Sequence, residues 1–230
     1  MSTQDQKKVK VLKNGPYEVT GNIPLNQLRF VPDNEDASLA YKEVKKYPQQ
    51  ETYHLCRCGK TNNKPFCDGS HLQGFDGTET AGHETYDQMA GFTEGKFIDL
   101  LDAEKLCAVA RFCDTNGTTW NLVEESESDK TNDIVIQQCC DCPSGRLTAV
   151  TKDGKRIEPK LPQEISILED PAVKVHGPIW VKGGIAIEDA DGIVYPVRNR
   201  VTLCRCGKSQ NKPFCDARHM QNEGEIKGEL

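Results

Sequence analysis

Two short stretches of this chain each place three cysteines and one histidine within sixteen residues. Both have the spacing C-x-C, then eight residues, then C-x3-H. The donors are Cys56, Cys58, Cys67 and His71 in the first copy, and Cys204, Cys206, Cys215 and His219 in the second. Thiolates and imidazoles are soft or borderline ligands, so four of them this close in sequence can close around a metal site locally. The spacing alone admits either zinc or an iron–sulfur cluster.

A third group of cysteines lies between the two copies, and it consists of Cys107, Cys113, Cys139, Cys140 and Cys142. Residues 131–140 are predicted to form a helix. Successive helical side chains project about 100° apart, so at most one of Cys139 and Cys140 is expected to face a cluster. The other three cysteines suit a [3Fe–4S] cluster, which takes one ligand per iron. A [4Fe–4S] cluster needs a fourth donor, for which Cys140 is the first candidate, followed by Cys139 or water. Without a stable cluster, these cysteines would be buried structural thiols.

The letters of the first copy resemble a known family. Pro65-Phe66-Cys67-Asp68-Gly69-Ser70-His71, with the C-x-C and Thr61 upstream, resembles the defining string of the CDGSH iron–sulfur domain. The resemblance implies a [2Fe–2S] cluster in each copy. The first two cysteines would hold its inner iron, and the third cysteine and the histidine its outer, more exposed iron. The second copy departs from the pattern at Ala217 and Arg218, which make its outer rim bulkier and more basic but remove no ligand.

The middle segment resembles the divergent single-cluster ferredoxin domain, which is often found with CDGSH motifs. Cys107 and Cys113 form C-x5-C, where bacterial ferredoxins have C-x2-C-x2-C, and Ala110 stands at the central position. Cys142 begins the string C-P-S-G. The resemblance implies that Cys107, Cys113 and Cys142 are cluster ligands.

Strands are predicted to lead into both motif copies. Period-two alternation predicts strands around 8–12 and 17–23, and a short strand at 52–55 leads into Cys56. The stretch 173–181 repeats the strand–turn–strand pattern of the N-terminal stretch, and residues 201–203 lead into Cys204 in the same way. The two motif copies lie 148 residues apart, whereas the turn glycines Gly15 and Gly177 lie 162 residues apart. The connection from the turn glycine to the cysteine motif is therefore shorter in the second copy of the duplicated unit. A short helix is predicted around 37–46, within the polar stretch 31–50.

These elements predict an α+β fold. CDGSH domains work in pairs, so residues 1–75 and 163–230 are expected to form a β-rich pseudo-twofold pair, with a β-cradle beside two cluster lobes. Residues 76–162 would form the inserted ferredoxin-like module. A pair within one chain predicts a monomer, because the pseudo-dimer removes the need for a second copy.

Composition sets limits on location and partners. Eleven cysteines are an odd number, and the polar stretch before residue 13 has no apolar signal region, so a reducing, cytoplasmic location is predicted. No run approaches the roughly 18 apolar residues of a membrane span, so no membrane association is expected. The net charge of −6 gives no basic footprint for nucleic acid.

The ligand sets favour redox chemistry. Replacing a thiolate by a neutral imidazole makes a cluster site less negative and easier to reduce. Arg57, Lys60, Arg205 and Lys208 would add to this if they face the clusters, and otherwise they are solvated surface cations. Asp68 and Asp216 fit the N-cap of a short helix that carries the histidine ligand.

No phosphate loop, dinucleotide fingerprint or nucleophile elbow is present in the sequence, so no enzyme activity is predicted. The sequence therefore predicts a multi-cluster iron–sulfur protein that transfers single electrons to and from redox partner proteins. The alternative is a protein of cluster storage, cluster transfer to apo iron–sulfur acceptors, or redox and pH sensing. A zinc-stapled interaction module is the third hypothesis.

Overall fold

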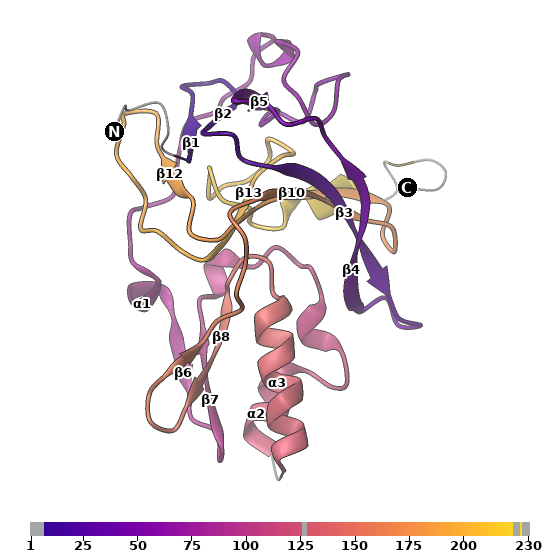
Figure 1. The fold of residues 1–230 in the computed structure, drawn as a ribbon, viewed down its shortest axis with the longest axis vertical. Helices are drawn as coiled ribbons and strands as arrows, with labels where there is room; N and C mark the ends of the chain where they lie inside the picture. The colour runs from indigo at the N-terminus through magenta and orange to yellow at the C-terminus, as the bar shows by residue number, and fades with distance from the viewer. Residues whose placement is uncertain (1–6, 126–127, 223–225, 227–230) are drawn as a thin grey trace.

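The computed structural model describes residues 7–125, 128–222 and 226. The two outer parts of the chain build two β-sheets, and the middle segment extends below them in Figure 1. Short helices accompany mixed and antiparallel sheets, so the predicted α+β class is confirmed.

The first sheet combines strands from both ends of the chain, in the order β12-β1-β2-β5. Its members are β1 (Lys8–Val11), β2 (Tyr17–Thr20), β5 (Thr52–Leu55) and β12 (Ala186–Glu188). The β1–β2 and β2–β5 pairs are antiparallel, whereas β12 joins β1 in parallel. This sheet therefore takes one edge strand from the second half of the chain.

The second sheet repeats this order as β13-β11-β10-β3 and adds β4 at its edge. Its members are β3 (Leu25–Pro32), β4 (Ser38–Lys46), β10 (Ile165–Asp170), β11 (Val175–Lys182) and β13 (Arg200–Leu203). Strand β3 joins β10 in parallel, as β12 joins β1. Each half of the duplication thus gives its third strand to the sheet of the other half, and the predicted pseudo-twofold pair is formed by strand exchange.

One hydrophobic core lies between these two sheets. Alternation along each strand turns one face inward, so that Val9, Val11, Tyr17 and Val19 are buried with Ile165, Ile167, Ile179 and Val181 from the other half. Both halves of the chain supply this core, so neither sheet can bury its apolar face without the other.

The prediction of a helix over 37–46 is wrong, because residues 38–46 form strand β4. The residues Leu39, Ala40, Glu43 and Lys45 favour helices individually. They nevertheless pair with β3 in an antiparallel ladder, which provides hydrogen-bond partners for the backbone groups on one side of this edge strand. Tyr41 also stacks on Phe112 and Trp180, which gives the strand a tertiary anchor.

The middle segment has a sheet of its own, in the order β6-β7-β8-β9. The sheet consists of β6 (Gly91–Thr93), β7 (Ile98–Asp102), β8 (Leu147–Thr151) and β9 (Arg156–Ile157). It follows the short helix α1 (Tyr86–Met89), and α2 (Thr119–Glu125) and α3 (Asp129–Asp141) pack against it around Leu100, Val123 and Val135. The helix predicted over 131–140 is confirmed as part of α3. The domain limits themselves stay predictions.

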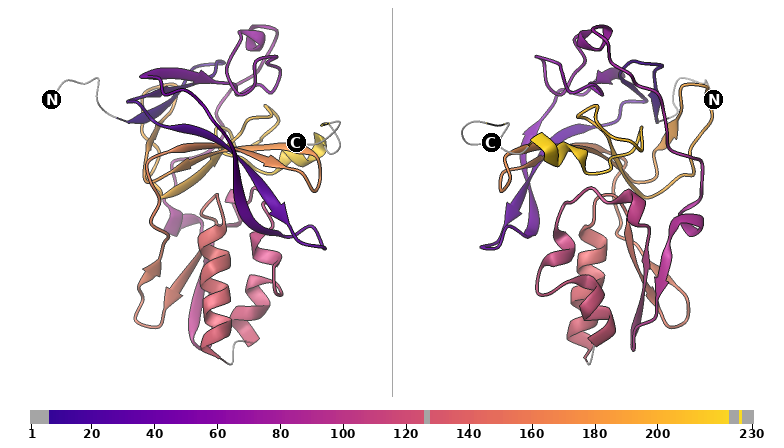
Figure 2. Two further views of the ribbon diagram at one scale, coloured as in Figure 1. Left: turned by 45° about the vertical axis from the view of Figure 1, so that its right-hand side comes forward. Right: turned by 180° about the vertical axis from the view of Figure 1, so that it is seen from behind.

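The middle segment is attached to the second sheet. Phe112 and Ala110 pack with Leu28, Leu168 and Trp180 in one cluster of apolar side chains. Figures 1 and 2 show the second cysteine motif, in yellow, between the middle segment and the first motif, in purple at the top. The middle segment therefore lies nearer to the second motif than to the first.

Candidate metal centres

The first motif is a loop that folds back on the end of β5. The Cys56 N–H donates to the Pro65 carbonyl at 2.8 Å, and the Cys67 N–H donates to the His54 carbonyl at 3.0 Å. The Thr61 hydroxyl donates to the Phe66 carbonyl at 2.7 Å and closes the turn between these two points. Backbone hydrogen bonds thus fix the positions from which the thiols project.

The four donors of the first motif form two pairs. The Sγ atoms of Cys56 and Cys58 lie 3.7 Å apart, and Cys67 Sγ lies 3.3 Å from His71 Nδ1. Two thiolates bound tetrahedrally to one metal at about 2.3 Å lie about 3.8 Å apart, so the first pair has the spacing of ligands on one metal. The second pair is similarly close.

Asp68 holds the outer pair in place, although not as the N-cap that was predicted. The short 3-10 helix η1 (Ser70–Leu72) has Gly69 at its N-cap position. The Asp68 carboxylate lies one residue earlier and accepts from the Ser70 N–H at 3.0 Å and from the Asn62 N–H at 2.9 Å. The Ser70 hydroxyl also donates to Asp68 at 2.6 Å, and this hydrogen bond, together with the two from the backbone, lowers the pKa of Asp68. The contacts tie the histidine turn to the cysteine loop.

The second motif repeats these contacts. The Cys204 N–H donates to the Pro213 carbonyl at 2.8 Å, and the Cys215 N–H donates to the Thr202 carbonyl at 2.9 Å. The Cys204–Cys206 Sγ atoms lie 3.7 Å apart, and Cys215 Sγ lies 3.4 Å from His219 Nδ1. Two copies with the same ladder of backbone bonds show that the motif itself dictates the geometry.

The second copy differs at its rim. Ala217 occupies the position of Gly69 and has φ of 67°, against 88° for the glycine, so an alanine stands in the left-handed region. Arg218 forms an ion pair with Asp216 at 3.1 Å. The histidine of the second motif, His219, lies in the 3-10 helix η4 (Arg218–Asn222) and is 4% exposed. Burial lowers the pKa of His219 to about 4, which keeps the imidazole in the neutral form that binds metals.

The two motif loops touch each other through a pair of glycines. A Cβ atom added to Gly59 would lie 2.8 Å from the Cys206 carbonyl oxygen, and one added to Gly207 would lie 2.7 Å from that of Cys58. Both glycines have positive φ. Only glycine therefore fits at this crossing, which brings the inner cysteines of the two sites close together.

The arginine between the first two cysteines is buried in both copies, so the interpretation of Arg57 and Arg205 as surface cations is wrong. Arg57 donates to the carbonyls of Gly15 at 2.9 Å and Leu12 at 3.2 Å. Arg205 pairs with the buried Glu169 at 2.9 Å. Each guanidinium therefore fastens its loop to the sheet behind it. The lysines that follow, Lys60 and Lys208, are exposed.

Three cysteines of the middle segment line one cavity of about 230 Å³. They are Cys107, Cys113 and Cys142, as the sequence predicted for a cluster. Burial raises the pKa of the Cys113 thiol to about 12, and the charges of Asp114, Cys142 and Cys107 add to this rise. A cation bound among these sulfurs would offset their mutual repulsion. The 3-10 helices η2 (Glu104–Leu106) and η3 (Phe112–Asp114) position the first two cysteines.

Neither of the remaining cysteines lines this cavity. Cys139 is fully buried in the apolar core of the middle segment. Cys140 is half-buried, and this burial raises the pKa of its thiol. The structure therefore brings three cysteines together and leaves Cys140, the first candidate for a fourth ligand, outside the cavity wall.

Arg200 is a residue that the sequence analysis missed. It lies on β13, is 1% exposed, and donates to the carbonyls of Cys139, Cys140 and Cys142 at 2.5, 3.1 and 2.8 Å. The Glu158 carboxylate balances its charge at 2.8 Å. Because β13 continues directly into Cys204, this side chain ties the last cysteine of the middle site to the second motif. No sequence motif marks it.

Other contacts also join the middle site to the second motif. The guanidinium of Arg198, which precedes β13, donates at 3.1 Å to the carbonyl of Ser144, two residues after Cys142. The Asn211 side-chain amide donates to the Lys105 carbonyl at 3.4 Å, two residues before Cys107. The three candidate sites thus follow each other in space as middle, second motif and first motif.

Among the residues that the structure describes, no three His, Cys, Asp or Glu side chains gather as a single metal ion requires. Each motif offers two separate pairs, and the middle cavity offers three spaced thiols. These donor sets fit polynuclear iron–sulfur clusters, in which different irons take different ligands.

Comparison with protein families agrees with this chemistry. A family model described as an iron-binding zinc finger of the CDGSH type matches residues 14–72 and 176–220. A second model, described as a divergent 4Fe-4S mono-cluster, matches residues 93–152. Curated proteins and solved structures gave no match to this chain.

The ligand pairs and the family matches together define an iron–sulfur protein. More particularly, the chain carries two CDGSH regions with a divergent mono-cluster ferredoxin-like region inserted between them. Within the described ranges, no helix has both the length and the apolar character that a membrane span needs.

Proposed function

We propose that this protein holds two [2Fe–2S] clusters and one [3Fe–4S] cluster and transfers single electrons between redox partner proteins. When bound, the clusters would supply one-electron redox chemistry. The observation that carries the proposal is the succession of three candidate sites, joined by the Arg200 contacts on one side and the Gly59–Gly207 crossing on the other. Electrons pass between buried centres only over short distances, so contiguous sites suit a relay.

The separate pairs support [2Fe–2S] clusters over single zinc ions in the two motifs. A structural zinc ion takes four ligands around one point. Here Cys56 and Cys58 form one pair, and Cys67 and His71 form another, as two irons with two ligands each would require. The same division recurs in the second motif.

The lining of the middle cavity supports a [3Fe–4S] cluster. It offers three thiols, one for each iron, and neither Cys139 nor Cys140 contributes to the wall. The family description names a 4Fe-4S cluster, which would need a fourth donor that these five cysteines do not supply from their present positions.

The side chains around the sites fit electron acceptance. A neutral histidine in place of one thiolate leaves each motif cluster less negative. Arg57, whose guanidinium donates only to backbone carbonyls among the described residues, adds buried positive charge beside the inner cysteines of the first motif, which also favours the reduced state.

One observation favours a second function, the transfer of whole clusters to apo iron–sulfur proteins. Cys67 and His71 are only half-buried, and the neighbouring Leu72 is 83% exposed. An acceptor protein could reach this outer ligand pair, whereas the corresponding pair of the second motif is buried.

The test is iron and acid-labile sulfide per chain, with EPR spectroscopy, on protein purified without oxygen. About seven irons and a signal in the oxidised state are expected for two [2Fe–2S] clusters and one [3Fe–4S] cluster. About eight irons without an oxidised signal would replace the middle assignment by [4Fe–4S], and about four would reduce the middle segment to scaffold. A colourless zinc protein would refute the proposal.

Incubation with apo-ferredoxin separates the two functions. A relay keeps its iron while it cycles between oxidised and reduced states. A carrier loses a cluster to the acceptor.

A further inference from the structure

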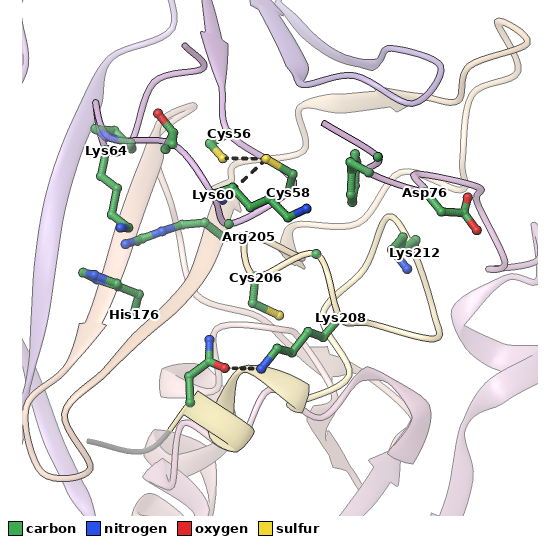
Figure 3. A pocket seen from close by; sticks show the side chains of 17 residues that line it. Cys56, Cys58, Lys60, Lys64, Asp76, His176, Arg205, Cys206, Lys208 and Lys212 are labelled. Carbon is green, nitrogen blue, oxygen red and sulfur yellow. Dashed lines mark hydrogen bonds between the residues drawn. The ribbon is translucent and has the colours of Figure 1, made fainter. Parts of the chain in front are cut away.

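A cavity of about 560 Å³ lies between the two motif loops (Figure 3). Its wall includes the inner cysteines Cys56 and Cys58 of the first motif and Cys206 of the second. A molecule at its mouth would therefore approach both motif sites at once.

Four lysines surround this cavity, and the duplication supplies them in pairs. Lys60 and Lys208 follow the Cys-Gly of each motif, and Lys64 and Lys212 precede the proline of each motif. Figure 3 shows Lys64 and Lys212 on opposite sides of the cavity, with Lys60 and Lys208 between them. The pseudo-twofold arrangement thus gathers on one face lysines that lie some 150 residues apart in the chain.

No ion pair within the described part of the protein neutralises the positive charge of these lysines, although Lys212 and the Asp76 carboxylate interact at longer range. None of the four forms an ion pair with a described residue. Lys60 and Lys212 donate only to the backbone carbonyls of Gln73 and Ser209, and Lys208 donates to the Asn222 amide. Arg205 in the same wall is balanced by Glu169. Asp76 is the single carboxylate among the lining residues.

This local charge is opposite to that of the whole chain, which has a net charge of −6. Three of the lysines are exposed and the fourth is half-buried, so their ammonium groups are accessible to a partner. A spread of separate ammonium groups is suited to steering and orienting a large acidic surface, because each acts as a point charge.

We propose that the cavity and its four lysines form the docking surface for an acidic electron-carrier protein. The inference rests on the proposed electron-transfer function and names the partner class of the motif sites. Docking would set the partner's redox group against the wall that holds Cys56, Cys58 and Cys206. With a flavodoxin as the partner, the anionic flavin hydroquinone gives up one electron to the protein and becomes the neutral semiquinone, with no proton transferred.

The test measures binding of an acidic flavodoxin to the cluster-loaded protein by titration calorimetry, and the reduction of the protein by dithionite as a separate readout. In the test variant, Lys60, Lys64, Lys208 and Lys212 are all replaced by glutamine. In the matched control, Lys42, Lys130, Lys155 and Lys160, which are exposed and line none of this cavity, are replaced by glutamine. Both variants change the net charge equally.

We expect the test variant to weaken the flavodoxin Kd about tenfold or more at low ionic strength and the control to leave it nearly unchanged. The affinity of the wild-type protein should fall as salt is added. Carbodiimide cross-linking, which joins lysine amines to carboxylates in contact, should attach flavodoxin at the four lysines. Dithionite should reduce both variants as it reduces the wild type.

The docking surface would be overturned if the two variants lost affinity equally, or if the cross-links were located elsewhere. Reduction by dithionite would in that case still uphold the electron-transfer function. Tight binding of inorganic pyrophosphate that depends on the four lysines, without any effect on flavodoxin, would make the cavity a small-anion site and also overturn it. If neither dithionite nor flavodoxin reduces the protein, the proposed function fails, and the docking surface falls with it.

Discussion

The two motif regions share their backbone contacts but differ in their surroundings. The first motif lies at the end of the molecule farthest from the middle segment (Figure 2), and its Cys67 and His71 are half-buried. In the second, Cys215 and His219 are 3% and 4% exposed. Duplication therefore reproduced the ligand geometry, whereas the inserted segment and the last turns of the chain made the sites unequal. A motif dictates which atoms bind, and its neighbours dictate how easily the bound group is reached.

Removing the Arg200 clamp should separate the two regions most strongly. Arg200→Met would remove a buried guanidinium that pairs with Glu158 and donates to the carbonyls of Cys139 and Cys142, and the lost hydrogen bonds should cost about 3 kcal/mol or more of unfolding free energy. Iron should be lost from the middle site before the first motif. Urea unfolding and EPR measure both effects. The control Arg156→Met breaks an exposed ion pair with Asp87 and should cost less than about 1 kcal/mol. Equal iron loss at all sites would contradict the clamp.

The glycine crossing offers a symmetrical test. Gly59→Val would push against the Cys206 carbonyl, and Gly207→Val against that of Cys58. Each should cost about 3 kcal/mol, because a branched side chain meets both a backbone clash and positive φ. Each variant should also disturb the cluster of the opposite motif. To see this, the visible spectrum is recorded in a background in which the cysteine ligands of the variant's own motif have been replaced, so that only the opposite motif contributes. A variant that disturbs only its own motif would show that the loops do not touch.

Iron release should distinguish the two motif sites without any change in stability. Because the outer pair of the first motif is partly exposed, a ferrous chelator should remove its iron about tenfold faster than iron of the second motif, which needs local opening first. The two phases are assigned with variants in which Cys67 or Cys215 is replaced by alanine. A single phase in the wild-type protein would mean that burial does not control access.

The smallest expected effect concerns the backbone position that Gly69 occupies in the first motif and Ala217 in the second. Ala217→Gly should stabilise the protein by about 1 kcal/mol, and Gly69→Ala should destabilise it by a similar amount, because alanine is strained at positive φ. No atom lies within 4 Å of a Cβ built on Gly69, so backbone strain alone decides this case. Thermal unfolding of the two variants is the measurement, and changes of the same sign would refute the argument.

The motif loops were predictable because their information is local. Backbone bonds from Cys56 and Cys67 close within the motif and the strand before it. In the middle segment, Cys142 directly follows a helix with clear boundaries. The duplication was also visible in the repeated letters, and the resemblance to the CDGSH domain implied its pseudo-twofold pairing. Arg57 and Arg205 stand at the same place in both copies, which is the one signal that could have revealed their buried role.

The rest depends on contacts between distant parts of the chain. Strand β4 has helix-forming residues, and only its ladder with β3 and the stacking of Tyr41 make it a strand. Arg200 has no motif around it, and its partners lie in the middle segment. The unequal burial of the two histidines likewise comes from neighbours that sequence spacing does not reveal.

The exchange of β3 and β12 has a consequence for how the protein is made. During synthesis from the N-terminus, β1 lacks its parallel neighbour until residue 188 has left the ribosome, and β3 waits for β10. The first sheet is therefore left with an unpaired edge, a state prone to wrong pairing, for most of translation. We therefore expect even the N-terminal motif to acquire its cofactor only when the polypeptide is nearly complete.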